Sequence, residues 1–541
     1  MTYLKSKVFE KSRSRSFLWK LCIGTLVLGI VVGFVASRFD FKSDLSLQSR
    51  IETYFSSNLT EFSQASDLQS QLTDVVYLLV EESFEAGELE LEELLTEIPF
   101  LSFWIQGEGE GDARFEDLFK KYLSAYELGL VDLFIETLGE NPDKALIRLK
   151  ELGDTNPIPR YVNQILALIE SNKELHDNAY YYLVKEGTFP EALWAREQAV
   201  INRHYRKDFK SLEDLESDPI YNDAFSPWIR MDLASHNHDW LSSIKWIAIG
   251  QLAGLQPGSF ILATIAMLVW GTILLQLGQA NRFDRWTPVL CFLGLILGML
   301  SITPTHFWIV LEDLYLPISE GEDLFHSIVY FIATVGLREE VCKLLLFLPL
   351  TPILIRRRNE LEFLLVASFV GLGFAYVENF NYLISSMGTG VAGRFLTANF
   401  FHISLTGMSG LFFCRMWKTR GFGYNDFLFI FGVAIIAHGL YDALLTHPPM
   451  DDSGFIALVL FVVFSKYYFQ EVHHLQEVSK SIISLSASMS FGISLLLASL
   501  VVYLSIVLSV SQAIQLGFGS FLGSGIILIM FFREFNESLG D

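Results

Sequence analysis

The amino-acid sequence predicts an all-α polytopic membrane protein with about ten transmembrane helices and an extracytoplasmic α-helical soluble domain inserted after the first helix. Composition is the first reason, because 51% of the 541 residues are hydrophobic and only 18% are charged. Soluble proteins carry about 25% charged residues. The mean hydropathy is accordingly positive, at +0.37. The second reason is that the apolar residues gather into separate runs, most of them near the ~20 residues that a helix needs to cross a bilayer.

The first predicted transmembrane helix occupies residues 17–36. The apolar run is longer than the core of a cleaved signal peptide and ends in a poor cleavage sequence, Ala36-Ser37-Arg38. These features favour an uncleaved signal anchor with a cytoplasmic N-terminus. Gly29 and Gly33 form a GxxxG pair, which is typical of a helix-packing face. Residues 1–16 form a basic segment with Lys5, Lys7, Lys11, Arg13 and Arg15.

The next segment, residues 37–256, contains no apolar run long enough to span a bilayer. Helical periodicity recurs there in short stretches that end at breakers such as Asn156-Pro157, Gly187 and Pro190. Helical hairpins joined by turns fit this pattern. It is similar to α-solenoid repeats of the tetratricopeptide kind, but no fixed period emerges, and a plain all-α domain fits equally well.

Nine further apolar runs follow, and the charges of their loops alternate as the positive-inside rule requires. The loops after residues 278, 354 and 416 are basic, whereas residues 312–323 and 451–453 are acidic or neutral. This pattern places both termini in the cytoplasm and residues 37–256 outside the cell membrane, as expected for a bacterial inner-membrane protein. Residues 257–447 form the predicted membrane core, and residues 448–541 add further transmembrane helices and a short cytoplasmic C-terminus. The nine runs are residues 259–278, 287–303, 326–354, 361–384, 391–416, 426–446, 454–470, 481–508 and 511–532.

The net charge and the cysteine content argue against a nucleic-acid-binding protein and against a protein built on disulfides or CxxC metal sites. The formal net charge is −22, which argues against nucleic-acid binding because that function needs a basic surface. The four cysteines, Cys22, Cys291, Cys342 and Cys414, all lie in apolar runs. The sequence therefore predicts no disulfide framework and no CxxC metal site.

Ionisable and amide side chains recur inside four consecutive predicted helices. Such groups are costly within a bilayer and are functional candidates by default. They also lie at a similar depth, in the outer half of the membrane, so we expect them to meet. In chain order the groups are Glu339, Glu340 and Lys343, then Glu378 and Asn379, then Asn399 and His402, and finally His438 and Asp442.

The spacing of these residues predicts two local units. Lys343 follows Glu339 by four residues and Glu340 by three, so it can lie near either carboxylate on a helix. His438 and Asp442 are four apart and share a helix face. Asp442 can therefore accept a hydrogen bond from one ring nitrogen of His438, which fixes the tautomer and leaves the other nitrogen available.

The combination Glu339-Glu340-x-x-Lys343, Phe374-x-x-x-Glu378-Asn379, His402 and His438-x-x-x-Asp442 resembles the PrsW family of intramembrane proteases. That family is more distantly similar to the CAAX prenyl endopeptidases and the bacteriocin-processing membrane proteases. The resemblance covers roughly residues 320–447 and implies an endopeptidase that cuts membrane-anchored proteins, for example at site 1 of an anti-sigma factor. The large segment before this region and the three helices after it depart from a minimal family member.

The residues suggest hydrolysis by an activated water. Glu339 or Glu340 would be the general base, and His402 would share the water or protonate the leaving amine. His438, oriented by Asp442, would stabilise the oxyanion, with Asn379 or Asn399 as a further donor. Lys343 and Glu378 have supporting roles in this scheme, and Glu378 fits a structural acceptor as well as a catalytic group.

A zinc ion is the open alternative to this metal-free scheme. Glu340, His402 and His438 would be its ligands, because two histidines and a carboxylate make a catalytic zinc set. The residue pattern favours no cofactor, since the chain contains no HExxH motif.

Two other function classes fit the same residues. Buried Glu, His and Asp side chains also describe a proton-coupled transporter or channel, although no inverted repeat is visible. A non-catalytic membrane sensor or scaffold is the third class. In each case the soluble domain is expected to bind a substrate or a regulator.

Overall fold

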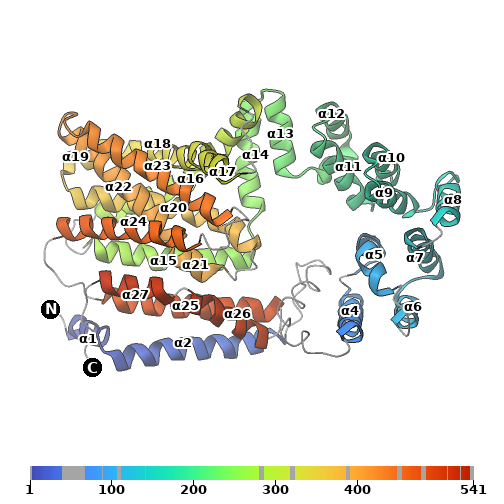
Figure 1. Cartoon of the computed structure of the whole chain (residues 1–541), viewed down its shortest axis with the longest axis horizontal. Coiled ribbons are helices and arrows are strands. Elements are labelled where there is room, and N and C mark those ends of the chain that lie inside the picture. The colour runs from blue at the N-terminus through green and yellow to red at the C-terminus, as the bar shows by residue number, and fades with distance from the viewer. Residues whose placement is uncertain are drawn as a thin grey trace. The chain divides into compact units, whose positions relative to one another are not determined.

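The computed structural model describes residues 3–38, 68–87, 89–105, 111–139, 142–278, 286–316, 323–385, 390–446, 454–476, 483–507, 510–523 and 525–535. Every regular element within these ranges is a helix, which confirms the all-α class. The short C-terminus predicted to be cytoplasmic lies largely outside the described residues. The chain folds into two compact units, Met1–Phe39 with Leu241–Asp541 (the membrane unit) and Asp40–Trp240 (the second unit) (Figure 1).

The second unit is built from short helices, most of which pack on the next one along the chain. Several of these helices begin at a side chain that caps the first turn. Ser124 and Glu127 form a capping box at α7, and the Asp208 and Ser226 side chains accept N–H groups of α12 and α13. The helices are α4 Leu68–Glu85, α5 Leu91–Ile105, α6 Gly111–Tyr122, α7 Ala125–Leu138, α8 Pro142–Gly153, α9 Val162–Asn172, α10 His176–Glu186, α11 Leu193–Tyr205, α12 Phe209–Ser217, η1 Pro219–Ala224 and α13 Pro227–His236.

A buried carboxyl joins α9 and α10 of this unit. Glu186, at the end of α10, accepts the N–H of Tyr161 at 2.7 Å, and Tyr161 is the residue that begins α9. Burial is the main influence on this carboxyl and raises the pKa of Glu186 to about 7, against the opposing effect of the Tyr161 N–H.

The membrane unit contains the long apolar helices, which lie side by side (Figure 1). Its elements are α1 Tyr3–Lys11, α2 Arg15–Ala36, α14 Trp240–Ala253, α15 Pro257–Leu277, α16 Trp286–Tyr315, α17 Leu324–Tyr330, η2 Phe331–Gly336, α18 Leu337–Phe347, η3 Leu348–Leu350, α19 Thr351–Arg357, α20 Glu360–Ser385, α21 Val391–Leu396, α22 Ala398–Lys418, α23 Tyr424–Thr446, α24 Gly454–Leu475, α25 Leu485–Val507, α26 Val510–Gly523 and α27 Gly525–Glu534. Seven helices in the described ranges are long and apolar enough to cross a membrane, namely α2, α15, α16, α20, α23, α24 and α25.

Three of the ten predicted spans do not qualify as single apolar helices. Residues 326–354 form several consecutive helical segments and carry the charges of α18, residues 391–416 break between α21 and α22, and residues 511–532 divide into α26 and α27. Two of these spans contain the candidate site residues, whose polarity lowers the hydropathy of the helix. The count of about ten therefore stays a prediction, while the multi-pass membrane class is confirmed.

Helix α20 forms the centre of the membrane unit, with 83% of its apolar window buried. It contacts α16, α15 and α22. Backbones touch directly at α16, because a Cβ on Gly298 would lie 2.0 Å from the Val370 carbonyl oxygen and a Cβ on Gly373 would lie 2.1 Å from that of Leu295. This close packing holds α20 in a fixed register for the polar residues at its end.

The GxxxG pair of α2 packs against α25. A Cβ on Gly29 would lie 2.6 Å from Ala498 Cβ, and one on Gly33 would lie 2.7 Å from Ser505 Oγ. The small residues therefore let these two helices approach along one face, as the pattern predicts.

Candidate active site

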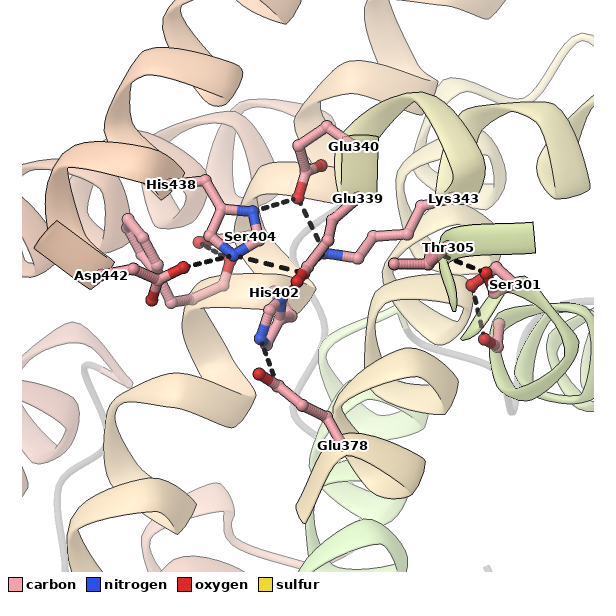
Figure 2. Close-up of polar contacts among 12 residues, drawn as sticks. Ser301, Thr305, Glu339, Glu340, Lys343, Glu378, His402, Ser404, His438 and Asp442 are labelled. Atoms are coloured by element: carbon pink, nitrogen blue, oxygen red, sulfur yellow. Dashed lines mark hydrogen bonds and ion pairs between the residues drawn. The ribbon is translucent and has the colours of Figure 1, made fainter. Parts of the chain in front are cut away.

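Four helices bring the candidate residues together around one point in the membrane unit (Figure 2). Helix α18 supplies Glu339, Glu340 and Lys343, and helices α20, α22 and α23 complete the group. Each of these three helices packs against α18. Their contribution to the group is Glu378, His402, His438 and Asp442.

Lys343 lies at the centre of this group. Its side chain has 0% exposure, and Nζ is 2.8 Å from Glu340 Oε1, 2.9 Å from His402 Nδ1 and 3.3 Å from Glu339 Oε2. These three acceptors match the three N–H bonds of an ammonium. The ring centroid of Phe374 lies 3.9 Å from Nζ, which adds a cation–π contact. One cation thus holds two carboxylates and an imidazole together in the interior.

His402 is held between Lys343 and Glu378. An ammonium can only donate, so His402 Nδ1 is the acceptor of the Lys343 hydrogen bond. The hydrogen of the neutral ring is then on Nε2, which donates to Glu378 Oε2 at 2.8 Å. Glu378 therefore fixes the orientation and the tautomer of His402 in this structure.

His438 is oriented by Glu340. Its Nδ1 lies 2.9 Å from Glu340 Oε1, so a neutral ring carries its hydrogen there. Nε2 lies 3.4 Å from Glu339 Oε2 and also 3.4 Å from Asp442 Oδ2. The sequence assigned the orienting role to Asp442, but Glu340 makes the shorter contact and Asp442 lies at the opposite nitrogen. Figure 2 shows His438 between the two carboxylates.

The environment of His438 Nε2 indicates a site for positive charge. With the hydrogen on Nδ1, this nitrogen presents a lone pair beside two carboxylate oxygens at 3.4 Å. Three electron-rich atoms in a buried place repel one another unless a proton or a cation lies among them. The arrangement therefore favours a positive charge at this place, supplied by an imidazolium, by a proton shared with one of the carboxylates or by a bound cation.

Arg394 is a site residue that the sequence reasoning missed. Its Nη2 donates to Glu378 Oε2 at 3.0 Å, and its Nε donates to Asn379 Oδ1 at 2.7 Å. Asn379 in turn donates to Asn399 at 2.7 Å. The two predicted amide donors thus position Arg394. The signal that could have found it was present, because Arg394 is an ionisable residue inside the predicted helix 391–416.

A cavity of about 680 Å³ opens beside these residues. Glu340 and Lys343 lie behind its wall, whereas Glu339 faces it, which separates the roles of the two adjacent glutamates. The polar lining consists of Arg338, Glu339, Glu378, Arg394, His402, His438 and Asp442. Apolar lining comes from Phe331, Val335, Phe401, Leu445 and Phe461, among others.

A π-helical turn, Phe331–Gly336, precedes the site residues of α18. Such turns are frequent at functional sites. Here it lies in backbone contact with α23, because a Cβ on Gly439 would lie 2.4 Å from Ile332 Cα and a Cβ on Gly336 would lie 2.4 Å from the Ile435 carbonyl oxygen. The contact sets the distance between α18 and α23, and therefore the contact between Glu340 and His438.

Gly439→Ala is expected to damage the site without touching a site residue. The new methyl group meets backbone atoms of Ile332, so α23 must move by several tenths of an ångström or more, and His438 moves with it. We expect a loss of activity of about 100-fold, as misplacement of this size costs in other enzymes. Gly432→Ala on the same helix meets nothing within 4 Å and serves as the control. Equal activities of the two variants, measured per folded protein, would show that this contact does not set the geometry.

Glu339, His402 and His438 each offer one ligand atom, and these atoms lie within 4.8 Å of one another. A carboxylate and two imidazoles are a donor set of catalytic zinc sites. Glu340 on His438 Nδ1 is the kind of carboxylate contact that supports a metal-ligating histidine. The residues therefore fit a divalent cation, and the convergent carboxylate is Glu339, whereas the sequence offered Glu340.

Comparison with protein families matches residues 287–467 to the PrsW family of intramembrane metalloproteases. Comparisons with characterised proteins and with solved structures find no match. The matched segment begins at α16 and ends in α24, so it includes all four helices of the candidate site. The resemblance seen in the motifs of α18, α20, α22 and α23 is thus confirmed. Residues 287–467 are therefore similar to the PrsW family of intramembrane metalloproteases, which supports a membrane protease function for this part of the chain.

Proposed function

We propose that the protein is an intramembrane endopeptidase that hydrolyses peptide bonds of membrane-anchored proteins with the help of a divalent metal ion, most simply zinc. The observation that carries this proposal is the convergence of Glu339, His402 and His438 within 4.8 Å beside a cavity of about 680 Å³. The family description supports the metal, and so does the lone pair of His438 Nε2 facing two carboxylates.

Glu339, His402 and His438 would hold the metal ion. To do so, His402 would exchange one of its two hydrogen bonds, to Lys343 at Nδ1 or to Glu378 at Nε2, for the metal. When bound, it would polarise the scissile carbonyl and lower the pKa of a water molecule, the two roles of a catalytic metal in hydrolysis. Glu340 keeps His438 Nε2 directed to the site by accepting the hydrogen of Nδ1. Lys343 pairs with both adjacent glutamates, and its charge partly offsets theirs in the interior.

Proton transfer and charge stabilisation fall to the remaining cavity residues. Asp442 faces the cavity 3.4 Å from His438 Nε2 and is placed to take a proton from the attacking water. Arg394 faces the same cavity, held by Glu378 and Asn379, and is placed to stabilise the oxyanion. The proton taken up by Asp442 would then pass to the leaving amine.

Metal removal is expected to abolish cleavage. Purified protein in proteoliposomes would be treated with a zinc chelator and tested on a panel of single-pass membrane substrates. We expect a loss of at least about 1,000-fold, since metal ions contribute several kcal/mol to the transition state, and full recovery when zinc is added back. Metal content, measured by elemental analysis, should fall in parallel.

Cleavage that continues unchanged in the chelator, with no metal in the protein, would contradict the metal scheme. It would instead support Glu339 as a general base without a metal. Ion flux in the same proteoliposomes, with no cleavage of any substrate, would support the transporter class.

The substrate is proposed to be a membrane-anchored protein, of the kind cleaved at site 1 of an anti-sigma factor. Apolar side chains, including Phe331, Val335 and Phe461, also line the cavity. Such a lining favours a peptide segment from a membrane helix over a polar loop.

Localisation in the bacterial inner membrane with both termini in the cytoplasm is part of the proposal. Ser484 N–H donates to Ser12 Oγ at 3.2 Å, and Gln276 donates to Ser488 Oγ at 3.1 Å. The start of α2, the end of α15 and the start of α25 therefore meet at one end of the membrane unit. Figure 1 shows α1 and α19 at one end as well. These are the ends that the basic residues assign to the cytoplasm.

The second unit is proposed to select substrates outside the membrane. Replacing residues 40–240 by a short linker should leave cleavage of a generic membrane peptide intact, because no residue of the candidate site lies there. Discrimination between natural substrates should fall by about tenfold or more, as expected when a binding module is removed. Both quantities come from competition assays with mixed substrates. Unchanged discrimination in a folded deletion protein would assign the second unit another role.

A further inference from the structure

A second cavity lies at the end of the membrane unit that carries the N-terminus. It has a volume of about 690 Å³ and lies between α2, α15 and α25, within the ~300–1,000 Å³ range of ligand sites. Its walls are apolar, formed by Leu18, Leu268, Val269 and Phe491, among others. Phe17 and Phe491 keep 37% and 38% of their surface exposed and Leu268 keeps 59%, so this groove opens to the surroundings of the helices.

Two lysines close one end of the groove. Lys7 and Lys11 both line it, and they lie one turn apart on α1, so they share a helix face. Lys11 Nζ lies 5.2 Å from the ring centroid of Phe17, which links the charged end to the apolar wall. Among the described lining residues no acidic side chain is present. The groove therefore combines apolar walls with two lysine side chains.

Chemistry of this kind fits an anionic phospholipid. A transmembrane helix from another protein would match the apolar walls, but it would not account for the two lysines. A soluble anion would match the lysines but not the apolar walls. A phospholipid with a negative headgroup matches both, and basic pockets between helices at the cytoplasmic side bind such headgroups.

We propose that this groove binds one anionic phospholipid, with an acyl chain along the walls of α2, α15 and α25 and the phosphate at Lys7 and Lys11. The site is separate from the candidate active site, because the two sets of lining residues have no member in common. The bound lipid would join the N-terminal helix to α15 and α25, which adds to the Gly29 and Gly33 contact of α2.

The test uses the full-length protein in nanodiscs that contain equal amounts of phosphatidylcholine and phosphatidylglycerol. Native mass spectrometry after release counts the lipids of each kind that stay bound. Wild-type protein should retain one phosphatidylglycerol in preference to phosphatidylcholine. The double variant Lys7→Gln/Lys11→Gln should lower this preference about 30-fold, because each lysine near an anionic surface contributes about 1 kcal/mol. Lys245→Gln, which removes a lysine of α14 over Trp246, is the matched control and should change nothing.

A separate substitution tests whether the acyl chain occupies the groove. Thr272 is an exposed residue in the groove wall, and Thr272→Trp should fill the space and lower retention of both lipids. An excess of inorganic phosphate should not displace the lipid. All variants lie at exposed positions, and their thermal unfolding is compared with that of wild type to establish that they fold.

Three results would overturn the proposal. Equal retention of the two lipids by wild-type protein would remove the role of charge. Unchanged retention in Thr272→Trp would show that the chain does not occupy the groove. Displacement by inorganic phosphate alone would indicate a headgroup site without an acyl chain.

Discussion

Glu339→Gln is expected to abolish cleavage, with a loss of about 1,000-fold or more, because it removes the carboxylate that faces the cavity and converges with His402 and His438. Groups that bind a catalytic metal or act as a base contribute factors of this size. The amide of Gln keeps the shape and one acceptor oxygen, so Lys343 retains a partner and the fold is preserved. Activity is measured in proteoliposomes with a single-pass substrate.

Glu340→Gln provides the comparison that makes this result specific. Glu340 lies behind the cavity wall and acts through His438 and Lys343. Loss of such a supporting contact costs about 10- to 100-fold. Glu471→Gln, a partly buried glutamate paired with Arg415 away from the site, should remain fully active. The opposite order, with Glu340→Gln the more severe variant, would exchange the roles of the two glutamates.

Lys343→Met is expected to destabilise the protein by about 3–5 kcal/mol, the range measured when one member of a buried ion pair is removed. Without the ammonium, Glu339 and Glu340 are left as neighbouring carboxylates in the interior with 8% and 1% exposure. Unfolding in detergent can be followed by labelling of Cys291, Cys342 and Cys414, all of which are buried.

A second substitution separates charge from shape. In Lys343→Met/Glu340→Gln one of the two negative charges is also removed, so we expect recovery of about half of the lost stability. Lys418→Met removes a lysine that pairs with Glu360 at the surface and should cost less than about 1 kcal/mol. Simple addition of the two single effects in the double variant would show that Lys343 and Glu340 do not interact.

The sequence predicted which residues form the candidate site better than it predicted which of their side chains contact one another. Ionisable groups in apolar runs are visible without a structure, and this signal found Glu339, Glu340, His402 and His438. Spacing within one helix suggested that Asp442 orients His438, since the two are four residues apart. The shorter contact comes from Glu340 on α18, 98 positions away in the chain. Contacts between helices depend on their packing, which no local pattern reports.

The predicted number of transmembrane helices was least certain in the segments that contain the candidate site residues. Residues 326–354 were predicted as a single span, and the structure keeps them helical throughout, although the helix type changes at Phe331–Gly336 and at Leu348–Leu350; residues 391–416 divide at Thr397. The break before α22 occurs at Thr397, and the π-helical turn Phe331–Gly336 precedes α18. Apolar periodicity reports that a segment is helical and buried, but it does not report where the helix changes to a π-helical turn or is divided at a single residue.

The central position of α20 bears on how the protein is made. Helices α16 and α20 are apolar enough to insert into the bilayer on their own. Helices α18 and α22 are not, because they carry Glu339, Glu340 and His402. We expect these two helices to enter the bilayer together with α20 and α23, which supply Glu378 and His438 as partners for their polar groups. We therefore expect the candidate site to form only when these helices have packed together in the membrane.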